Sequence, residues 1–313
     1  MVIRPIRREE LAEFAAFSDQ TERNTALAAT LEDWLSGDQT RLEWLIVAED
    51  EGAFAGRIAY TTDSGLSHPL YVHFFDAPWG SEGARLRDEL FRRSLALSGG
   101  DRAAQIEFFL DTPSPQVSAP ESLTQALYHL GFALTLERVR MEWAPASSLP
   151  ASTQRFTFRT LNEVGNEVFI AAMARVSEGT LDSYTQQRCA EIDALAEARE
   201  HFQDEQRFQK RWEPYWWQLA YDEAGALVGL VMPAENTSWP NIGYIGVVPE
   251  QRGRGYVDEL IIQGTQTLLK EGATRIIADT DSGNVPMANA FRRCGYTQYG
   301  IRRIFTLRPV ESR

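Results

Sequence analysis

Hydrophobic and polar positions follow two periods along the chain, and together they predict an α/β fold. Short β-branched and aromatic runs are typical of strands, and apolar residues spaced three or four apart are typical of helices. In residues 257–271, Val257, Leu260, Ile261, Leu268 and Leu269 share one helical face. In the second half of the chain we expect strands over 156–161, 217–221, 226–233, 242–248 and 274–280, and helices over 163–176, 181–212 and 257–271.

The first half repeats this pattern. Three pairs of segments resemble each other and occur in the same order: 3–6 and 158–161, 44–56 and 217–229, 126–132 and 290–296. Chance similarity of short apolar segments is the alternative, but the preserved order favours a duplicated domain. We therefore predict two tandem α/β domains with mixed sheets, over residues 1–146 and 154–313, joined by a Pro/Ser/Ala-rich linker at 145–153.

A glycine-rich turn between a strand and a helix is the sharpest local signal. The strand ends at Val247-Val248, and a helix begins after the loop Gln251–Tyr256. Main-chain amides at the start of a helix are unpaired and bind phosphate groups. Gly253 and Gly255 allow a close approach to a ligand, and the side chains of Arg252 and Arg254 add positive charge. An ordinary tight connection is the alternative; neither a Walker loop nor a complete Rossmann fingerprint is present.

The segment Gln251-Arg252-Gly253-Arg254-Gly255 resembles the Gln/Arg-x-x-Gly-x-Gly signature of the GNAT superfamily of acyl-CoA N-acyltransferases. Residues 284–296 resemble that family's closing helix at the matching spacing. The resemblance implies a mixed, largely antiparallel twisted sheet flanked by helices in each domain. It also implies acetyl transfer from acetyl-CoA to a primary amine of a small molecule, by direct attack in a ternary complex.

The resemblance assigns the coenzyme site residue by residue. Val247 and Val248 would offer main-chain groups to the pantetheine arm. Arg252 to Tyr256 would hold the pyrophosphate through main-chain amides, and Asn284 would contact the pantetheine or the amine end of the coenzyme.

The corresponding loop of the first half is degenerate. Aligning Pro78 with Pro249 places Ser81, Glu82 and Ala84 where the second loop has Arg252, Gly253 and Gly255. A carboxylate at a phosphate site opposes binding. We expect the first domain to bind no coenzyme A and to serve as a structural or substrate-shaping domain.

Residues for proton transfer are harder to assign. The position where many family members carry a tyrosine acid is Phe291, and Tyr296 is interpreted as a core residue. Asp279 and Asp281 would lie on one face at the end of a strand, where they could recognise or deprotonate an amine. The alternative for this pair is a turn or helix cap. Tyr244 is a third catalytic candidate.

The composition excludes some classes of partner. The formal net charge of -13 opposes binding to nucleic acid, and no apolar run is long enough to span a membrane. The start lacks the layout of a secretory signal, so we expect a cytoplasmic protein; Lys210 and Lys270 are the only lysines, which suggests a GC-rich bacterial genome. Cys189 and Cys294 are expected to be buried thiols. The four histidines have no metal-ligand spacing, so no metal site is expected: His68, His73, His129 and His201.

Two functions besides catalysis fit the same pattern. One is a non-catalytic acyl-CoA sensor, which Phe291 favours, and the other is an interaction protein. The sequence leaves open the identity of the acceptor amine, the acyl chain length, the general acid and base, and the oligomeric state.

Overall fold

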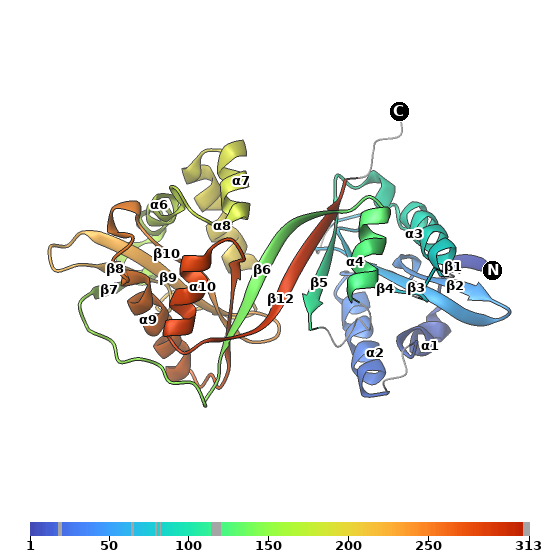
Figure 1. Cartoon of the computed structure of the whole chain (residues 1–313), viewed down its shortest axis with the longest axis horizontal. Coiled ribbons are helices and arrows are strands. Elements are labelled where there is room, and N and C mark those ends of the chain that lie inside the picture. Colours follow the sequence, from blue (N-terminus) through green and yellow to red (C-terminus); the bar gives the residue numbers. More distant parts are fainter. Residues whose placement is uncertain (18–20, 64–65, 79, 82, 114–119, 309–313) are drawn as a thin grey trace. The chain divides into compact units, whose positions relative to one another are not determined.

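The computed structural model of the chain describes residues 1–17, 21–63, 66–78, 80–81, 83–113 and 120–308. The chain divides into two compact units (Figure 1). Unit 1 comprises Met1–Thr135 with Arg303–Arg313, and unit 2 comprises Leu136–Arg302.

Unit 1 contains a mixed sheet with the strand order β1-β2-β3-β4-β5-β12. Neighbouring strands are antiparallel except for β4 and β5, which are parallel, among the pairs whose register is described. The strands are β1 (Val2–Pro5), β2 (Leu45–Asp50), β3 (Ala53–Thr61), β4 (Tyr71–Asp76), β5 (Ile106–Thr112) and part of β12 (Thr297–Leu307), and the helices are α1 (Leu11–Ala15), α2 (Thr21–Ser36), α3 (Ala84–Ser98) and α4 (Pro120–His129).

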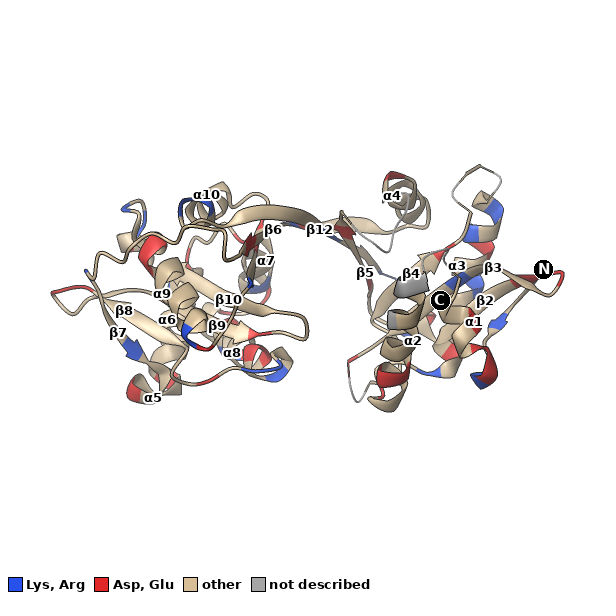
Figure 2. Ribbon diagram, turned by 90° about the horizontal axis from the view of Figure 1, so that it is seen from below, with Lys and Arg blue, Asp and Glu red and all other residues tan. Residues whose placement is uncertain are grey.

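Unit 2 has the strand order β12-β6-β11-β10-β9-β8-β7, again mostly antiparallel (Figures 1 and 2). Its strands are part of β6 (Ala133–Trp143), β7 (Thr157–Thr160), β8 (Gln218–Tyr221), β9 (Leu227–Glu235), β10 (Pro240–Val247), β11 (Ile276–Asp281) and part of β12. Its helices are α5 (Leu161–Val164), α6 (Asn166–Ser177), α7 (Ser183–Glu191), α8 (Ala194–Phe208), α9 (Tyr256–Lys270) and α10 (Val285–Arg293). The predicted fold class, α/β with a mixed, largely antiparallel sheet flanked by helices in each half, is confirmed.

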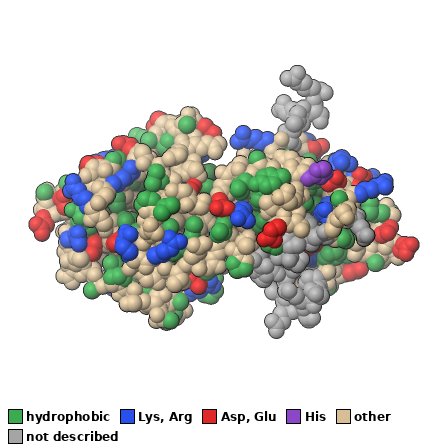
Figure 3. Space-filling model, in the orientation of Figure 1, with side chains coloured by type: hydrophobic (Ala, Val, Ile, Leu, Met, Phe, Trp, Pro, Cys, Tyr) green, Lys and Arg blue, Asp and Glu red, His purple; other side chains and the backbone are tan. Residues whose placement is uncertain are grey.

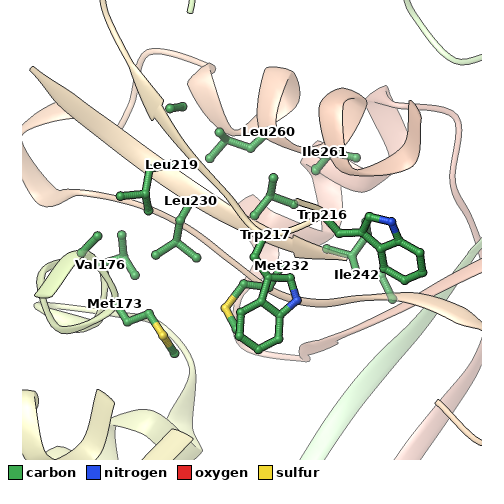
Figure 4. Packing of buried hydrophobic residues seen from close by; sticks show 14 of the residues in the cluster. Met173, Val176, Trp216, Trp217, Leu219, Leu230, Met232, Ile242, Leu260 and Ile261 are labelled. Carbon is green, nitrogen blue, oxygen red and sulfur yellow. The ribbon is translucent and has the colours of Figure 1, made fainter. Parts of the chain in front are cut away.

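Helices cover both faces of the unit 2 sheet. On one face, Val176 of α6 packs against Gly246 of β10; on the other, Gly264 of α9 packs against Val231 and Ile242. Figure 4 shows side chains of α6 and α9 on opposite sides of the strands. This two-sided core explains why the strands of the second half are apolar nearly throughout.

Strand β6 belongs to the first half of the sequence but completes the sheet of unit 2. It pairs antiparallel with β11, from Trp143 opposite Ile276 to Arg138 opposite Asp281. Met141 is fully buried there in the core of unit 2. The units therefore divide at Leu136 and Arg303, which differs from the predicted limits of 1–146 and 154–313. The predicted limits followed linker composition, which does not report which sheet a strand joins.

We expect Met141→Ala to destabilise unit 2 by about 2–5 kcal/mol, because it leaves a cavity in a close-packed core. The control is Leu134→Ala on the same strand, where the side chain is 40% exposed and the expected change is within about 0.5 kcal/mol. Denaturant unfolding followed by tryptophan fluorescence measures both. Equal, small effects would show that β6 does not stabilise the unit 2 core.

Candidate functional site

Strands β10 and β11 diverge after a single paired position. They are parallel neighbours, and their described register is Asn241 opposite Ile277. Strand β10 nevertheless continues to Val247 and β11 to Asp281. Their carboxyl ends are therefore separated by a gap in which main-chain groups lack a ladder partner, and such groups require another partner when buried.

The register with β9 determines which groups of β10 face this gap. Val248 donates its amide to the carbonyl oxygen of Val228 at 3.0 Å, so its main-chain groups point toward β9. Because the direction alternates along an antiparallel strand, the main-chain groups of Ile245 and Val247 point toward the gap. Of the two predicted pantetheine contacts, only Val247 thus has an amide available, and Ile245 is a candidate that the sequence analysis missed.

The glycine loop between β10 and α9 carries a set of unpaired amides. Gly253 and Gly255 have positive φ angles of 75° and 73°, which only glycine adopts without strain. Within the described part of the chain, no group accepts a hydrogen bond from the amides of the five consecutive residues Gly253 to Val257. A Cβ at either glycine would meet nothing within 4 Å, so the loop is open on that side. These features fit a diphosphate at the positive end of α9.

Arg252 bonds main-chain carbonyls at the end of β10 and around the end of α6. Its amide donates to the carbonyl oxygen of Pro249 at 3.2 Å. Its guanidinium donates to the carbonyl oxygens of Val247 at 3.0 Å, Gly179 at 2.9 Å and Val176 at 2.9 Å. These carbonyls hold the guanidinium against the end of β10, the end of α6 and the segment after it, and its contribution of charge to a phosphate site stays a prediction.

The other polar residues of the loop are engaged in local contacts. Gln251 is 9% exposed, donates its amide to the Val248 carbonyl and accepts from Arg254 Nη1 at 3.0 Å. Counted back from Gly253, the first position of the signature falls on Glu250, not on Gln251. Glu250 pairs with Arg175 of α6. Tyr256 begins α9 and is one of the residues with an unpaired amide.

Asn284 caps helix α10. Its side-chain oxygen accepts from the amide of Met287 at 3.3 Å, which satisfies an otherwise orphaned donor at the helix start. Its contact with pantetheine stays a prediction. Because the side-chain oxygen is already bonded, the side-chain NH₂ group would make that contact.

Asp279 and Asp281 are both engaged with neighbouring groups. Asp281 is 7% exposed and accepts from the amide and hydroxyl of Ser183 and from the amide of Gly283 at 2.7 Å. It therefore acts as a cap, as in the turn-and-cap alternative. Asp279 lies 3.4 Å from the guanidinium of Arg140 on β6. Neither carboxylate is free, so proton acceptance by either would break an existing interaction.

The aromatic candidates have distinct environments. Phe291 and Tyr296 are buried and pack edge to face at 5.1 Å, and Tyr296 bonds Thr265 at 2.7 Å, so its interpretation as a core residue is confirmed. Tyr244 lies on the face of β10 that packs against α6 and α8. Its hydroxyl is 3.2 Å from Ser177 Oγ, and burial raises its pKa.

A charged cluster on α8 lies beside Tyr244, and the sequence analysis missed it. The ring of His201 contacts the ring of Tyr244 edge to face at 4.6 Å. Glu197 and Glu205, one helical turn away on each side, lie 3.5 Å from the two ring nitrogens. Burial lowers the pKa of His201, but the two neighbouring carboxylates outweigh it and raise the pKa to about 9. The four-residue spacing was the signal available in the sequence.

In the corresponding loop of unit 1, two of the described amides are paired within the loop. Gly83 donates to the Gly80 carbonyl and Ala84 to the Ser81 carbonyl, each at 3.2 Å. The guanidinium of Arg87 binds the carbonyls of Pro78 and Gly80. Glu82, on which the prediction of a degenerate site partly rests, lies outside the described residues.

The end of β4 in unit 1 also differs from the end of β10. The side chain of Arg57 is fully buried, bonds Asp76 at 2.7 Å and donates to the carbonyls of Phe14 and Ala15. Arg57 therefore joins the end of this strand, through its ion pair with the half-buried Asp76, to the main chain of α1.

Comparison with known proteins agrees with the geometry of unit 2. Residues 176–296 match the acetyltransferase (GNAT) family. A mycothiol acetyltransferase from Pseudarthrobacter chlorophenolicus is 32% identical over 103 residues, which cover 30% of this chain and 32% of that protein. The match thus spans about a third of the length of this curated relative. The match to the GNAT family is confined to residues 176–296, in the second half of the chain.

Solved structures match the whole chain in fold. A GCN5-related N-acetyltransferase from Sphaerobacter thermophilus superimposes with a TM-score of 0.58 at 15% identity, covering 98% of this chain and 95% of that one. A tandem GNAT protein from the clavulanic acid biosynthesis pathway gives a TM-score of 0.54 at 15% identity, covering 100% and 99%. At this identity the likeness concerns the fold, and it is consistent with the tandem arrangement inferred from the internal repeat.

The described residues contain neither a membrane-spanning helix nor a group of metal ligands. None of their helices has the length and apolarity to cross a bilayer, and none of their His, Cys, Asp and Glu side chains form a group of three suited to a metal ion. Figure 3 shows acidic and basic side chains interspersed on the visible face.

The His201 cluster predicts a pH-dependent stability. Because its pKa is raised from 6.5 to about 9 on folding, its contribution is fully present below pH 6.5 and is lost as the pH rises through about 9. The difference is at most about 3 kcal/mol. Unfolding free energies of the wild type and His201→Gln, measured across this range, should converge toward high pH. A constant difference between them would contradict the raised pKa.

Proposed function

We propose that the protein is an N-acetyltransferase that transfers acetyl from acetyl-CoA to a primary amine of a small molecule. The observation that carries the proposal is the run of unpaired amides from Gly253 to Val257 at the start of α9. A diphosphate at the start of the helix would accept hydrogen bonds from several of these amides, which otherwise have only water as a partner.

The donor would lie along the divergent strands. The amides of Gly253 to Tyr256 would hold the pyrophosphate, and the main-chain groups of Ile245 and Val247 would bind the pantetheine arm in the gap beside β10. Arg252 supports this arrangement indirectly, because it fixes the end of β10 against the last turn of α6 and the segment that follows it.

Direct attack in a ternary complex fits the residues present. The neutral amine of the acceptor attacks the thioester carbonyl carbon, a C–N bond forms, and the C–S bond breaks with release of the coenzyme thiol. Burial raises the pKa of Cys294 to about 12, which disfavours a covalent acyl-enzyme at that thiol. The second candidate, an acyl-CoA sensor without turnover, is favoured by one observation: Phe291 cannot protonate the departing thiolate.

The test is thiol release from acetyl-CoA with five primary amines: glucosamine, kanamycin, L-lysine, spermidine and glycylglycine. We expect at least one to be consumed, with the acetylated amine identified by mass spectrometry. Coenzyme A binding without turnover on a broader amine panel would support the sensor, and absence of binding would refute the proposed function.

Gly255→Ala is expected to weaken coenzyme A binding at least tenfold, because a side chain at φ 73° strains the loop by about 1–2 kcal/mol and moves its amides. Gly225→Ala is the matched control: Gly225 has φ 77°, also has open space around it and lies in the β8–β9 turn. Both variants should lose similar stability, and only the first should lose affinity in calorimetry. Equal affinities would show that this loop does not hold the coenzyme.

Binding should saturate at one coenzyme A per chain, because the amides of Gly83 and Ala84 in the loop of unit 1 are already bonded to carbonyls of that loop. Calorimetric stoichiometry and density at 253–256 in soaked crystals measure this. Density at residues 80–85, or a stoichiometry of two, would contradict the assignment of unit 1 as a domain without coenzyme.

A further inference from the structure

Helix α8 carries three ionisable side chains on one face, which we call the α8 ladder: Glu197, His201 and Glu205. Glu197 is 3% exposed, and its Oε2 has no hydrogen-bond partner in the described part of the chain. Gln209 donates to Glu205 Oε2 at 2.9 Å, while its own side-chain oxygen lacks a partner. Buried carboxylates and amides without full hydrogen bonding are costly, so this arrangement needs a compensating reason. Figure 2 shows the charged residues along α8.

The ladder lies against a β-bulge. The register of β10 with β9 shifts between Ile242 and Tyr244, which makes Gly243 the extra residue. Glu205 Oε2 lies 2.6 Å from where a Cβ of Gly243 would be, so the absence of a side chain at Gly243 leaves room for the carboxylate in this position. Bulges are over-represented beside active sites. This one lies two residues before Ile245, whose main-chain groups point into the gap where the donor is proposed to bind, and His201 contacts the intervening Tyr244.

We propose that His201 accepts the proton of the acceptor ammonium, and that Glu197 and Glu205 are positioning residues that orient its ring. The proposal rests on the proposed function, because it assigns a role in that reaction.

The proton balance is simple. The ammonium of the acceptor gives one proton to His201, whose imidazolium is then flanked by two carboxylates. The resulting amine forms the C–N bond at the thioester carbon, and the C–S bond breaks. The second amine proton goes to the departing sulfur, and His201 returns its proton to water. The net products are the amide, the coenzyme thiol and one proton.

The environment of the His201 ring determines the pH range in which the ring can accept a proton. Only neutral His201 accepts a proton, so kcat/KM should rise with pH toward the pKa of the ring, near 9. The charged or titratable groups that face the ladder come from α7, from the segment before it, from α8 and from β10: Cys189, Asp182, Glu200, Asp204, Arg207 and Tyr244.

Glu197→Gln and Glu205→Gln test the ladder without changing its shape. Each removes one negative charge beside the ring, so the pKa of His201 should fall by about 1 unit or more. The proposal predicts that the ascending limb of kcat/KM, measured with the best acceptor among the five amines above, shifts to lower pH by the same amount. His201→Gln should lower kcat/KM by about 10²–10⁴-fold.

The matched control is Glu167→Gln, which removes the same charge from an exposed pair with Arg199 of α8. This variant should not shift the ascending limb of the pH profile of kcat/KM. The pKa of His201 is measured separately by NMR titration of its ring proton in the protein without substrates, and coenzyme A affinity by calorimetry confirms that the donor site is intact in each variant.

The outcomes separate the possibilities. Parallel shifts of the NMR pKa and the kinetic limb support the proposal. An NMR shift without a kinetic shift overturns the role of His201 as proton acceptor, and an unchanged NMR pKa overturns the ladder itself. If the wild type binds coenzyme A but acetylates no amine, the proposed function fails and this inference fails with it. This holds even if the pKa of His201 measured by NMR shifts in the variants.

Discussion

The structure of unit 2 depends on one constraint. Two parallel strands, β10 and β11, separate in the middle of the sheet and leave main-chain groups unpaired. After Asn241 and Ile277, β10 and β11 leave main-chain donors and acceptors without a ladder partner. Water or a ligand must satisfy these groups, because buried unpaired backbone is costly. The glycine loop that follows β10 adds five more unpaired amides at the positive end of a helix. An extended molecule with a diphosphate at one end and amide groups along its arm meets both requirements.

The rest of the unit keeps the strands apart. Arg252 ties the end of β10 to carbonyls in the last turn of α6 and just after it, and Asp281 at the end of β11 holds Ser183 at the start of α7. The segment from Val176 to Ser183 is therefore fixed at both strand ends. On the other side of β11, β6 supplies a full antiparallel ladder, so β11 does not need β10 as a partner. The separation is a property of several elements that pack together, and it does not depend on the loop alone.

Much of this could be predicted from the sequence, because some signals are local. The strand–glycine–helix turn, the apolar face of α9 and the order of elements all follow from spacing and turn chemistry. Other features depend on neighbours in space. The charge of Arg252 is visible in the sequence, but the carbonyls of Val176 and Gly179 that its guanidinium binds are not. Likewise, the spacing of Glu197, His201 and Glu205 is visible in the sequence, but the contact of His201 with Tyr244 on β10 is not. Strand β6 pairs with β11, which is distant in the sequence, and the composition of a segment does not encode such a pairing.

The most direct test of the account is hydrogen exchange of the loop amides by NMR, with and without coenzyme A. The account predicts that the amides of Gly253, Arg254, Gly255 and Tyr256 exchange rapidly alone and become protected on binding, while Gly83 and Ala84 do not change. If coenzyme A binds and these four amides continue to exchange as before, the diphosphate is held elsewhere and the central claim is wrong.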